Sequence, residues 1–528
     1  MFSLLKLKYP VILIFSGIMT LSCSPIRIIR EFRDPVQHLS FDPSKKIVKV
    51  HMKDGCLFIL DNLITNNHSD TIMGNGSYYD QHRILIKLNS GNKYFISESQ
   101  FKVPLSDVAL LETNDLKGLK GEALMMALVG VPSSIITGYC LINPKACFGS
   151  CPTFYAWNGE DTCLMAEGFS SSILPSFEKE DIDMLYGTKV TGNSIHLRLT
   201  NEALETHIIR YADLLAFPRF NNDRIFASQE GKFYRISDIR GTSNCKASEG
   251  DISEAVRQMD NKERYCPADQ KNLAQREYIE MSFDSIPDGE FGLIVGCRQT
   301  LLTTFLFYQS LAYLGNSAGY FASRIESGDK SLEEKVNRVW DLLGGIEVFV
   351  GSGDGKWTKV DQIEEMGPIA TDVHLVPLPK TGTKNLKIKL RLTKGLWRID
   401  YLALGKMENR IEPAIVHPSI VTALNKSERN SEIQVPDTLH PLVTLPGDVY
   451  DLHYVLPVIA GEYEIFLKSK GYYIEWMRET WMTEESLKNA ALFFGFPKKF
   501  MRMAAADFKK NEPSMENNFW NSRYVKKN

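Results

Sequence analysis

Short segments with alternating apolar and polar residues recur along the chain, and this period of two restricts its fold more than any other feature. The clearest is residues 386–393, LKIKLRLT, and similar alternation runs through 46–52 and 194–200. Successive side chains of a β-strand point to opposite faces, so these segments predict strands with one buried and one exposed face. The chain is therefore expected to be mainly β, with some α-helix.

Length and composition narrow the class of protein further. The 528 residues suggest three or four domains, because single domains commonly span about 100–200 residues. Lys and Arg number 61 and Asp and Glu 64, and the net charge of −3 excludes a generally basic nucleic-acid binder. Hydrophobic residues make up 44%, which excludes a mostly disordered chain. No nucleic-acid partner is expected.

Changes in the local pattern divide the chain into six parts. Residues 332–343 have helical spacing, the acidic run at 176–185 suggests a short helix, and 240–275 reads as loops and short helices. The tail turns helical, with Thr483 and Gly495 as caps. The expected order is a signal peptide (1–22), a tether (23–45), a small all-β module (46–115), a cysteine-rich, disulfide-braced α+β centre (116–330), a jelly-roll-like β-sandwich (331–470) and a helical C-terminal segment (471–528).

The N-terminal residues indicate export. Lys6 and Lys8 precede the apolar run 9–22, which is too short to span a bilayer comfortably and is followed by Cys23. A small residue before cysteine at this place resembles the lipobox of bacterial lipoproteins. The resemblance implies that Cys23 is acylated, becomes the mature N-terminus and anchors the protein to a membrane of the bacterial cell envelope.

Two residues close to Cys23 affect how its surroundings compare with the lipoprotein pattern. Thr20 stands where the lipoprotein family usually has Leu, Val or Ile, so an ordinary cleaved signal peptide with a chance cysteine is the alternative. Ser24, in place of Asp after the cysteine, resembles the outer-membrane sorting pattern of Gram-negative lipoproteins. The expected location is therefore the envelope, at the outer membrane.

Two later uncharged stretches, 123–144 and 299–323, are about long enough to cross a bilayer. Pro132 interrupts the first and Gln309 interrupts the second. Both are therefore expected to be buried helices, with membrane contact as the alternative.

Eight cysteines remain after Cys23, and most lie in the centre of the chain. An even number in an exported protein favours disulfides, so the centre is expected to be cross-linked. The candidates for a disulfide or redox role are Cys56, Cys140, Cys147, Cys151, Cys163, Cys245, Cys266 and Cys297.

The sequence Cys147-Phe-Gly-Ser-Cys151-Pro is the sharpest local motif. With Phe154 it resembles, over residues 145–185, a bacterial envelope domain of unknown function that begins C-x-G-x-C-P-x-[YF]; this resemblance implies no activity. The C-x-x-x-C-P spacing also resembles copper-carrying, thioredoxin-like proteins of the Sco type, in which a distant histidine completes the site. A hairpin pattern, not a helix, follows here, so structural bridges are favoured, either a strained one between Cys147 and Cys151 or bridges to partners such as Cys140 or Cys163.

Residues 346–405 resemble the galactose-binding-like β-sandwich. The resemblance rests on Trp357, the strand at 386–393 and Trp397-Arg-Ile-Asp400. It implies carbohydrate binding through exposed aromatic side chains. The candidate ligand-binding residues are Trp357, Trp397, His374 and Asp372. The alternative is that both tryptophans are core residues, since large aromatic side chains mostly pack inside.

Familiar catalytic and metal motifs are missing. Glu202, Glu205 and His207 lack the His-Glu-x-x-His spacing of a zinc helix and are expected to form a solvated face. Residues 351–356 lack the spacing of a phosphate-binding loop and are expected to form a hairpin turn. No cofactor or metal is therefore expected.

Together these features predict a lipid-anchored envelope protein with a non-catalytic binding or scaffolding role. Its expected partners are the membrane, through the anchor, and a glycan or an envelope protein. One alternative is a thiol–disulfide or copper-handling protein that uses Cys147 and Cys151. Another is an envelope hydrolase whose site assembles from residues far apart in the sequence.

Overall fold

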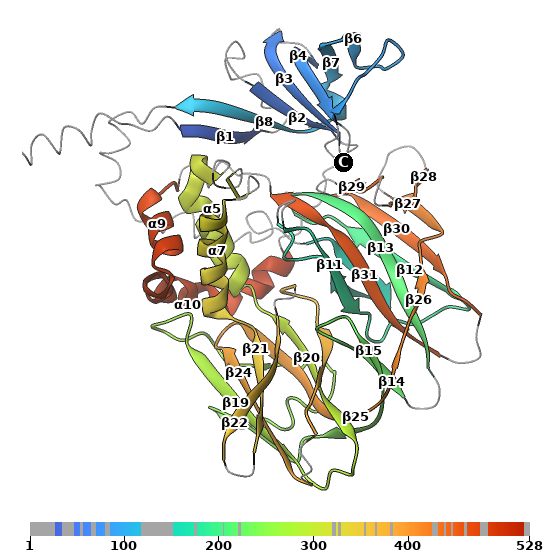
Figure 1. The fold of residues 1–528 in the computed structure, drawn as a ribbon, viewed down its shortest axis with the longest axis vertical. Helices are drawn as coiled ribbons and strands as arrows, with labels where there is room; N and C mark the ends of the chain where they lie inside the picture. Colours follow the sequence, from blue (N-terminus) through green and yellow to red (C-terminus); the bar gives the residue numbers. More distant parts are fainter. Residues whose placement is uncertain are drawn as a thin grey trace, which may run out of the picture.

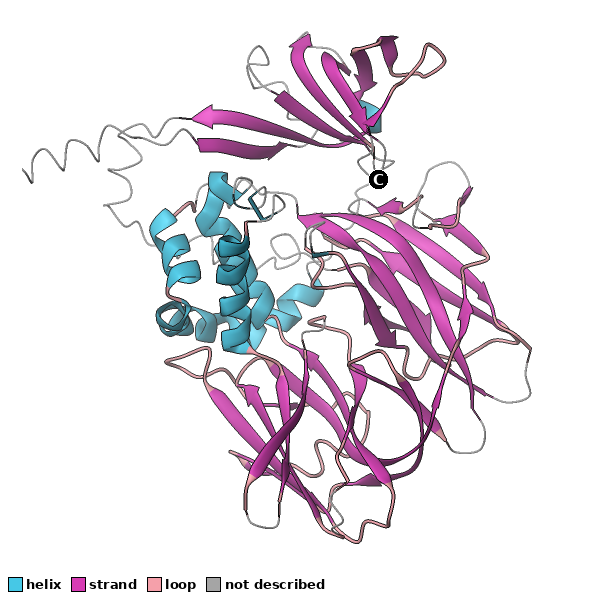
Figure 2. Ribbon diagram, viewed as in Figure 1, coloured by secondary structure: helices cyan, strands magenta, loops and turns pink. Residues whose placement is uncertain are grey.

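The structure is a computed structural model dominated by β-strands, with helices gathered on one side (Figure 2). It describes residues 27–33, 47–52, 56–64, 70–79, 85–117, 151–173, 177–203, 205–219, 223–318, 321, 324–325, 329–352, 355–364, 367–380, 384–424, 431–437, 440–444, 447–458, 462–475 and 484–521. The prediction of a mainly β, multidomain chain with some α-helix is confirmed.

The N-terminal part folds into one sheet, sheet A, in the order β1-β8-β2-β3-β4-β7-β6, with β5 paired to β4. Val48, Val50 and Phe58 form its core together with Phe101. Strand β1 pairs antiparallel with β8, so residues expected in the tether belong to this sheet. The strands are β1 (Arg27–Arg33), β2 (Ile47–Met52), β3 (Leu57–Ile64), β4 (Thr71–Tyr79), β5 (Leu85–Ile86), β6 (Phe95–Ser97), β7 (Gln100–Pro104) and β8 (Val108–Lys117).

A first sandwich is built from two segments far apart in the sequence. Sheet B has the order β10-β9-β12-β30-β27-β28, and sheet C the order β11-β31-β13-β26, with β29 on β13. One core lies between the two sheets. Sheet B contains β9 (Thr153–Trp157), β10 (Thr162–Glu167), β12 (Ser194–Thr200), β27 (Ile420–Ala423), β28 (Ser431–Ile433) and β30 (Val449–Val455). Sheet C contains β11 (Lys179–Met184), β13 (Glu205–Arg219), β26 (Ala414–Val416), β29 (Leu442–Thr444) and β31 (Glu462–Glu475).

A second sandwich is inserted between β13 and β26 of the first. Sheet D has the order β15-β14-β23-β20-β25-β18, and sheet E the order β17-β16-β19-β24-β21-β22. Sheet D contains β14 (Arg224–Ser228), β15 (Phe233–Gly241), β18 (Arg264–Tyr265), β20 (Glu290–Gln299), β23 (Asp372–Pro377) and β25 (Trp397–Ile411). Sheet E contains β16 (Asn244–Ala247), β17 (Gly250–Asp251), β19 (Arg276–Phe283), β21 (Ile346–Gly351), β22 (Trp357–Ile363) and β24 (Leu386–Thr393).

The sheets do not follow the expected division at residue 330. Strand β20 pairs with β25 along its whole length, although the two lie on opposite sides of that boundary. The span 331–470 therefore contributes strands to both sandwiches instead of forming one.

Sheets B, C, D and E follow one another, each sharing a core with the next, and β15 also pairs with β25, so that sheet D closes on itself. In sheet C, Leu214 faces the core shared with sheet B, while the adjacent Leu215 faces a core shared with sheet D. In sheet D, Ile294 faces sheet C, while the adjacent Val295 faces sheet E. The two middle sheets are thus buried on both faces, which leaves the outer faces of B and E to the solvent.

Within the residues that the structure describes, four helices complete the core of the second sandwich (Figure 1): α5 (Leu302–Leu314), α7 (Lys330–Leu343), α9 (Leu487–Gly495) and α10 (Pro497–Asn521). The side chain of Asp329 caps α7 by accepting hydrogen bonds from the backbone N–H groups of Ser331 and Leu332. Ser486 caps α9, and Gly495 is its last residue, while Thr483 lies outside the described residues.

The two uncharged stretches have different outcomes. Residues 302–314 of the second form the buried helix α5, as predicted, and the first lies outside the described residues. None of the helices in the described part of the chain is both long and apolar enough to cross a membrane.

Two local predictions were wrong. The acidic run expected to be a short helix contains strand β11, which pairs with β31 in sheet C. The stretch 240–275 consists largely of loops, as expected, but in place of the expected short helices it contains the short strands β16, β17 and β18.

Candidate functional site

The expected disulfide bracing is not present among the described cysteines. The free thiols are Cys151, Cys163, Cys245, Cys266 and Cys297, which corrects the prediction of a cross-linked centre for these residues. Cys56 is buried in the core of sheet A. Cys23, Cys140 and Cys147 lie outside the described residues.

The environment of the buried thiols is unlike that of reactive ones. Burial raises the pKa of Cys151 well above its usual range, and the carboxylates of Glu167 and Glu205 raise it further. Burial also raises the pKa of Cys245 to about 12 and that of Cys266 to about 11. Reactive cysteines have lowered pKa values and accessible sulfurs, so these positions favour a packing role.

The polar group Glu202, Glu205 and His207 is buried, which corrects the expectation of a solvated face. His207 Nε2 lies 2.8 Å from Glu205 Oε1, and both side chains are fully buried. Glu202 accepts a hydrogen bond of 2.7 Å from the hydroxyl of Tyr155. These partners close the group off inside the first sandwich. Within the described residues, no set of three or more His, Cys, Asp or Glu side chains is placed to hold a metal ion.

The four candidate ligand-binding residues do not form one site, although His374 Nε2 lies 3.1 Å from Asp372 Oδ2. Trp397 is 1% exposed, in the core of the second sandwich, so it is a core residue. Asp372 accepts a hydrogen bond of 2.8 Å from the backbone N–H of Met184, across the contact between the two sandwiches. His374 Nδ1 lies 2.9 Å from Gln229 Nε2. Of the four, Trp357 alone lies on a surface of sheet E, where it is half-buried.

Trp357 belongs to a surface that we call the basic aromatic face, defined by Tyr278, Phe349, Trp357, Lys387, Lys389 and Arg391. These residues come from strands β19, β24, β21 and β22, which are neighbours in sheet E. They lie on the side opposite the core because the alternating residues of the same strands, such as Ile279 and Leu390, are fully buried. The face is thus the outer surface of the stack of sheets.

Lys389 lies among the three aromatic rings. Its Nζ is 4.1 Å from the ring centroid of Trp357, 5.4 Å from that of Tyr278 and 6.0 Å from that of Phe349. A cation within about 6 Å of a ring centroid is attracted by the electron-rich ring face. The rings therefore hold this ammonium in place on the surface.

Arg391 and Glu347 form a second fixed pair beside the rings. The Arg391 guanidinium lies 5.6 Å from the Phe349 ring and donates a hydrogen bond of 2.8 Å from Nη2 to Glu347 Oε1. Lys359 also contacts this carboxylate, at 3.1 Å. Arg391 and Lys359 together lower the pKa of Glu347 to about 2, so the carboxylate is ionised at all ordinary pH values.

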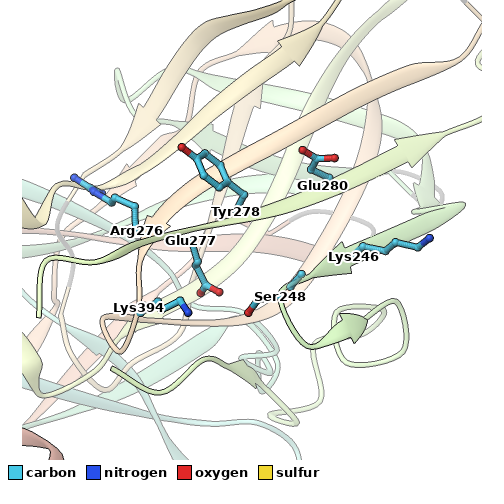
Figure 3. Close-up of a pocket in the computed structure, with 8 residues that line it drawn as sticks. Lys246, Ser248, Arg276, Glu277, Tyr278, Glu280 and Lys394 are labelled. Atoms are coloured by element: carbon cyan, nitrogen blue, oxygen red, sulfur yellow. The ribbon is translucent and has the colours of Figure 1, made fainter. Parts of the chain in front are cut away.

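A cavity of about 380 Å³ adjoins this face at the end of β16 (Figure 3). Figure 3 shows Arg276, Tyr278 and Glu280 projecting from one side of β19, with Glu277 on the other side. The lining residues are Lys246, Ala247, Ser248, Arg276, Glu277, Tyr278, Glu280 and Lys394. Tyr278 therefore belongs both to the cavity and to the basic aromatic face.

Sequence reasoning identified Trp357 but missed its neighbours. The alternation in 386–393 places Lys387, Lys389 and Arg391 on one side of a strand, and REYIEMSF places Tyr278 on the exposed side of another. That periodicity could have found the face. Only the pairing of β19, β24, β21 and β22 shows that these side chains are neighbours.

Comparisons with known proteins supply no function. No family model matches the chain. No curated protein matches it either. Among solved structures, a glycoside hydrolase family 31 α-xylosidase from Xanthomonas citri aligns over 85% of this chain at 8% identity, with a TM-score of 0.14. The chain spans 38% of the length of that enzyme. The secreted serine protease VesC from Vibrio cholerae aligns over 72% of this chain and 98% of its own, at 6% identity with a TM-score of 0.13.

Proposed function

We propose that this protein is a lipid-anchored protein of the bacterial cell envelope that binds a glycan without catalysis. The observation that carries the proposal is the exposed array in which Lys389 lies 4.1 Å from the ring of Trp357 and 5.4 Å from that of Tyr278. Tyrosine and tryptophan are enriched where proteins recognise partners, and charged groups beside them add orientation and specificity.

Binding is favoured over catalysis by the environment of the reactive side chains. The His207–Glu205 pair is fully buried, and burial raises the pKa of the Cys151 thiol. Neither is open to a substrate. The basic aromatic face, by contrast, is accessible and already organised, since ring contacts and ion pairs hold its cations in place.

Glycan binding can be tested with the full-length protein extracted from membranes in detergent. A glycan array should show selective binding, and Trp357→Ala or Tyr278→Ala should weaken it about tenfold, because an aromatic contact contributes about 1 kcal/mol or more. Trp157→Ala is the matched control, since Trp157 is 44% exposed on β9 of the other sandwich. Equal losses of glycan binding in all three variants would contradict the proposed site. Binding of protein partners without binding of any glycan would contradict the proposed function.

The anchor has its own test. Mass spectrometry of the N-terminal peptide should show an acylated Cys23, and Cys23→Ser should move the protein from the membrane fraction to the soluble fraction. An unmodified Cys23 in a membrane-bound protein would rule out the lipid anchor while leaving the glycan site intact.

A further inference from the structure

We infer that the glycan is an anionic polysaccharide, bound across the basic aromatic face with an acidic group held in the adjoining cavity. This inference rests on the proposed function and specifies the ligand of the same site. It is carried by three features: the use of the ring faces, the balance of fixed charges, and the residues that line the cavity.

The first feature is that a cation already occupies the aromatic surface. A neutral sugar stacks its C–H groups against the free face of a ring. Here Lys389 Nζ lies over the Trp357 ring at 4.1 Å, and the guanidinium of Arg391 lies 5.6 Å from Phe349. What these rings present to a ligand is therefore positive charge held in a fixed position, which suits an anion.

The second feature is a local excess of positive charge. The chain as a whole carries a net charge of −3, so the cations on this face are not a reflection of overall composition. Glu347 neutralises Arg391 and Lys359 in part. Within the described part of the chain, Lys387 and Lys389 form no ion pair. Their charges are available to a ligand.

The third feature is the cavity itself. Its volume of about 380 Å³ is that of a small-ligand site, and Lys246, Arg276 and Lys394 supply three cations to its lining. Of its two carboxylates, Glu277 is already held by Arg264, through contacts of 2.6 and 2.7 Å. The other carboxylate, Glu280, is paired across the sheet with Lys246 on one neighbouring strand and with Lys389 on the other, so two lysines flank it.

Arg276 has a guanidinium held at one end of the cavity by backbone oxygens. Its guanidinium donates to the backbone oxygens of Leu342 and Gly345, at 3.4 and 3.5 Å. Burial is the main cause that lowers the pKa of Arg276; the attraction of Glu347 opposes it, and the repulsion of Arg391 adds a smaller lowering. An acidic group in the cavity would be attracted by Lys246, Arg276 and Lys394, because each of these cations would gain an opposite charge nearby.

The inference is tested by comparing polysaccharides that contain acidic sugars with neutral polysaccharides and with polyanions of other kinds. Full-length protein in detergent is titrated with polygalacturonate and alginate, with the neutral polymers dextran and pullulan, and with single-stranded poly-dT and poly-glutamate as anions without acidic sugars. We expect the acidic polysaccharides to bind at least tenfold more tightly than the other polymers, with affinity falling steeply between 50 and 300 mM salt.

Charge-removing variants locate the site. Lys389→Met keeps the stem of the side chain and should weaken binding of the acidic polymer about tenfold, because a charge-assisted hydrogen bond contributes roughly 1.5–3 kcal/mol. Lys394→Met should have a similar effect at the cavity. Lys102→Met removes one charge from an exposed position of sheet A and should change affinity less than twofold. Unfolding curves for each variant separate loss of the site from loss of the fold.

The possible failures are distinct. Equal binding of acidic and neutral polysaccharides would overturn the anionic ligand but leave the proposed glycan function standing. Equal binding of poly-dT or poly-glutamate would show a surface that attracts any polyanion and would also overturn the inference. Binding of no polysaccharide at all, in the array or in solution, would overturn the proposed function itself.

Discussion

Breaking the ion pair between Arg264 and Glu277 should destabilise the second sandwich more than any single surface change. Arg264 Nη1 lies 2.6 Å from Glu277 Oε1 and Nη2 lies 2.7 Å from Oε2, a two-point contact. Both side chains are 2% exposed. Burial by itself lowers the pKa of Arg264, but its hydrogen bonds to Glu277 and Glu249 raise the value above the usual range. The guanidinium is therefore charged, buried and dependent on its partners.

The expected cost follows from this geometry. Removing one partner of a buried pair costs about 3–5 kcal/mol, because a buried charge is left uncompensated. In the Glu277→Ala variant, Glu249 still contacts Arg264 Nε at 2.7 Å, but that carboxylate is 44% exposed and compensates weakly. We therefore expect a loss near the lower end, about 3 kcal/mol, or roughly a hundredfold in the unfolding constant.

The assay is hydrogen–deuterium exchange of β19 peptides at increasing urea, which follows this sandwich separately from the other parts of the chain. The control is Glu254→Gln, which breaks an exposed pair with Arg257 and should cost less than about 1 kcal/mol. Replacing both Arg264 and Glu277 by Leu should recover most of the loss. A cost below about 1 kcal/mol for Glu277→Ala, or a double variant worse than the single, would refute the reasoning.

Three further outcomes are expected. Burial raises the pKa of Glu484 to about 7, so the folded protein binds this proton more tightly than the unfolded chain does. The free energy of unfolding should therefore fall as pH rises from about 4.3 to 7. Glu484→Gln should flatten that part of a plot of urea midpoint against pH. Gly395→Ala should lower the free energy of unfolding in urea by about 2 kcal/mol or more, because φ is +77° and a Cβ would lie 2.4 Å from Ala268 Cβ. Gly250→Ala is the control: φ is +115°, but no atom lies near the new Cβ, so it should cost less. Iodoacetamide should alkylate Cys297 after unfolding without reductant but not in the native protein, and a need for reductant would contradict the free thiol.

Local periodicity predicted strands well wherever a strand has one buried face. In 386–393 the buried residues alternate with lysine and arginine, because β24 lies in an outer sheet of the stack. The interior sheets lack this alternation. Strand β13 is apolar over most of its length because Leu214 packs towards sheet B and Leu215 towards sheet D.

The nested arrangement of the two sandwiches could not be predicted from local pattern. It depends on pairings such as β13 with β31, which join residues about half the chain apart. A second long-range pairing, of β11 with β31, explains why the helix predicted at 176–185 is wrong. Strand β11 completes the edge of sheet C beside β31, and this contact outweighs the helical appearance of its acidic sequence. Burial raises the pKa of Asp183 in that strand well above its usual range.

The contrast between the two tryptophans shows what decides a candidate site in this fold. Trp357 and Trp397 both begin strands of the second sandwich, and both were candidates for binding. Trp397 is 1% exposed in the core, whereas Trp357 lies on the outer face, where it meets the ammonium of Lys389. A shift of one residue in register reverses the face that a side chain occupies. An aromatic residue becomes a candidate for binding here because its register places it beside exposed cations of adjacent strands, and a sequence read strand by strand does not contain that information.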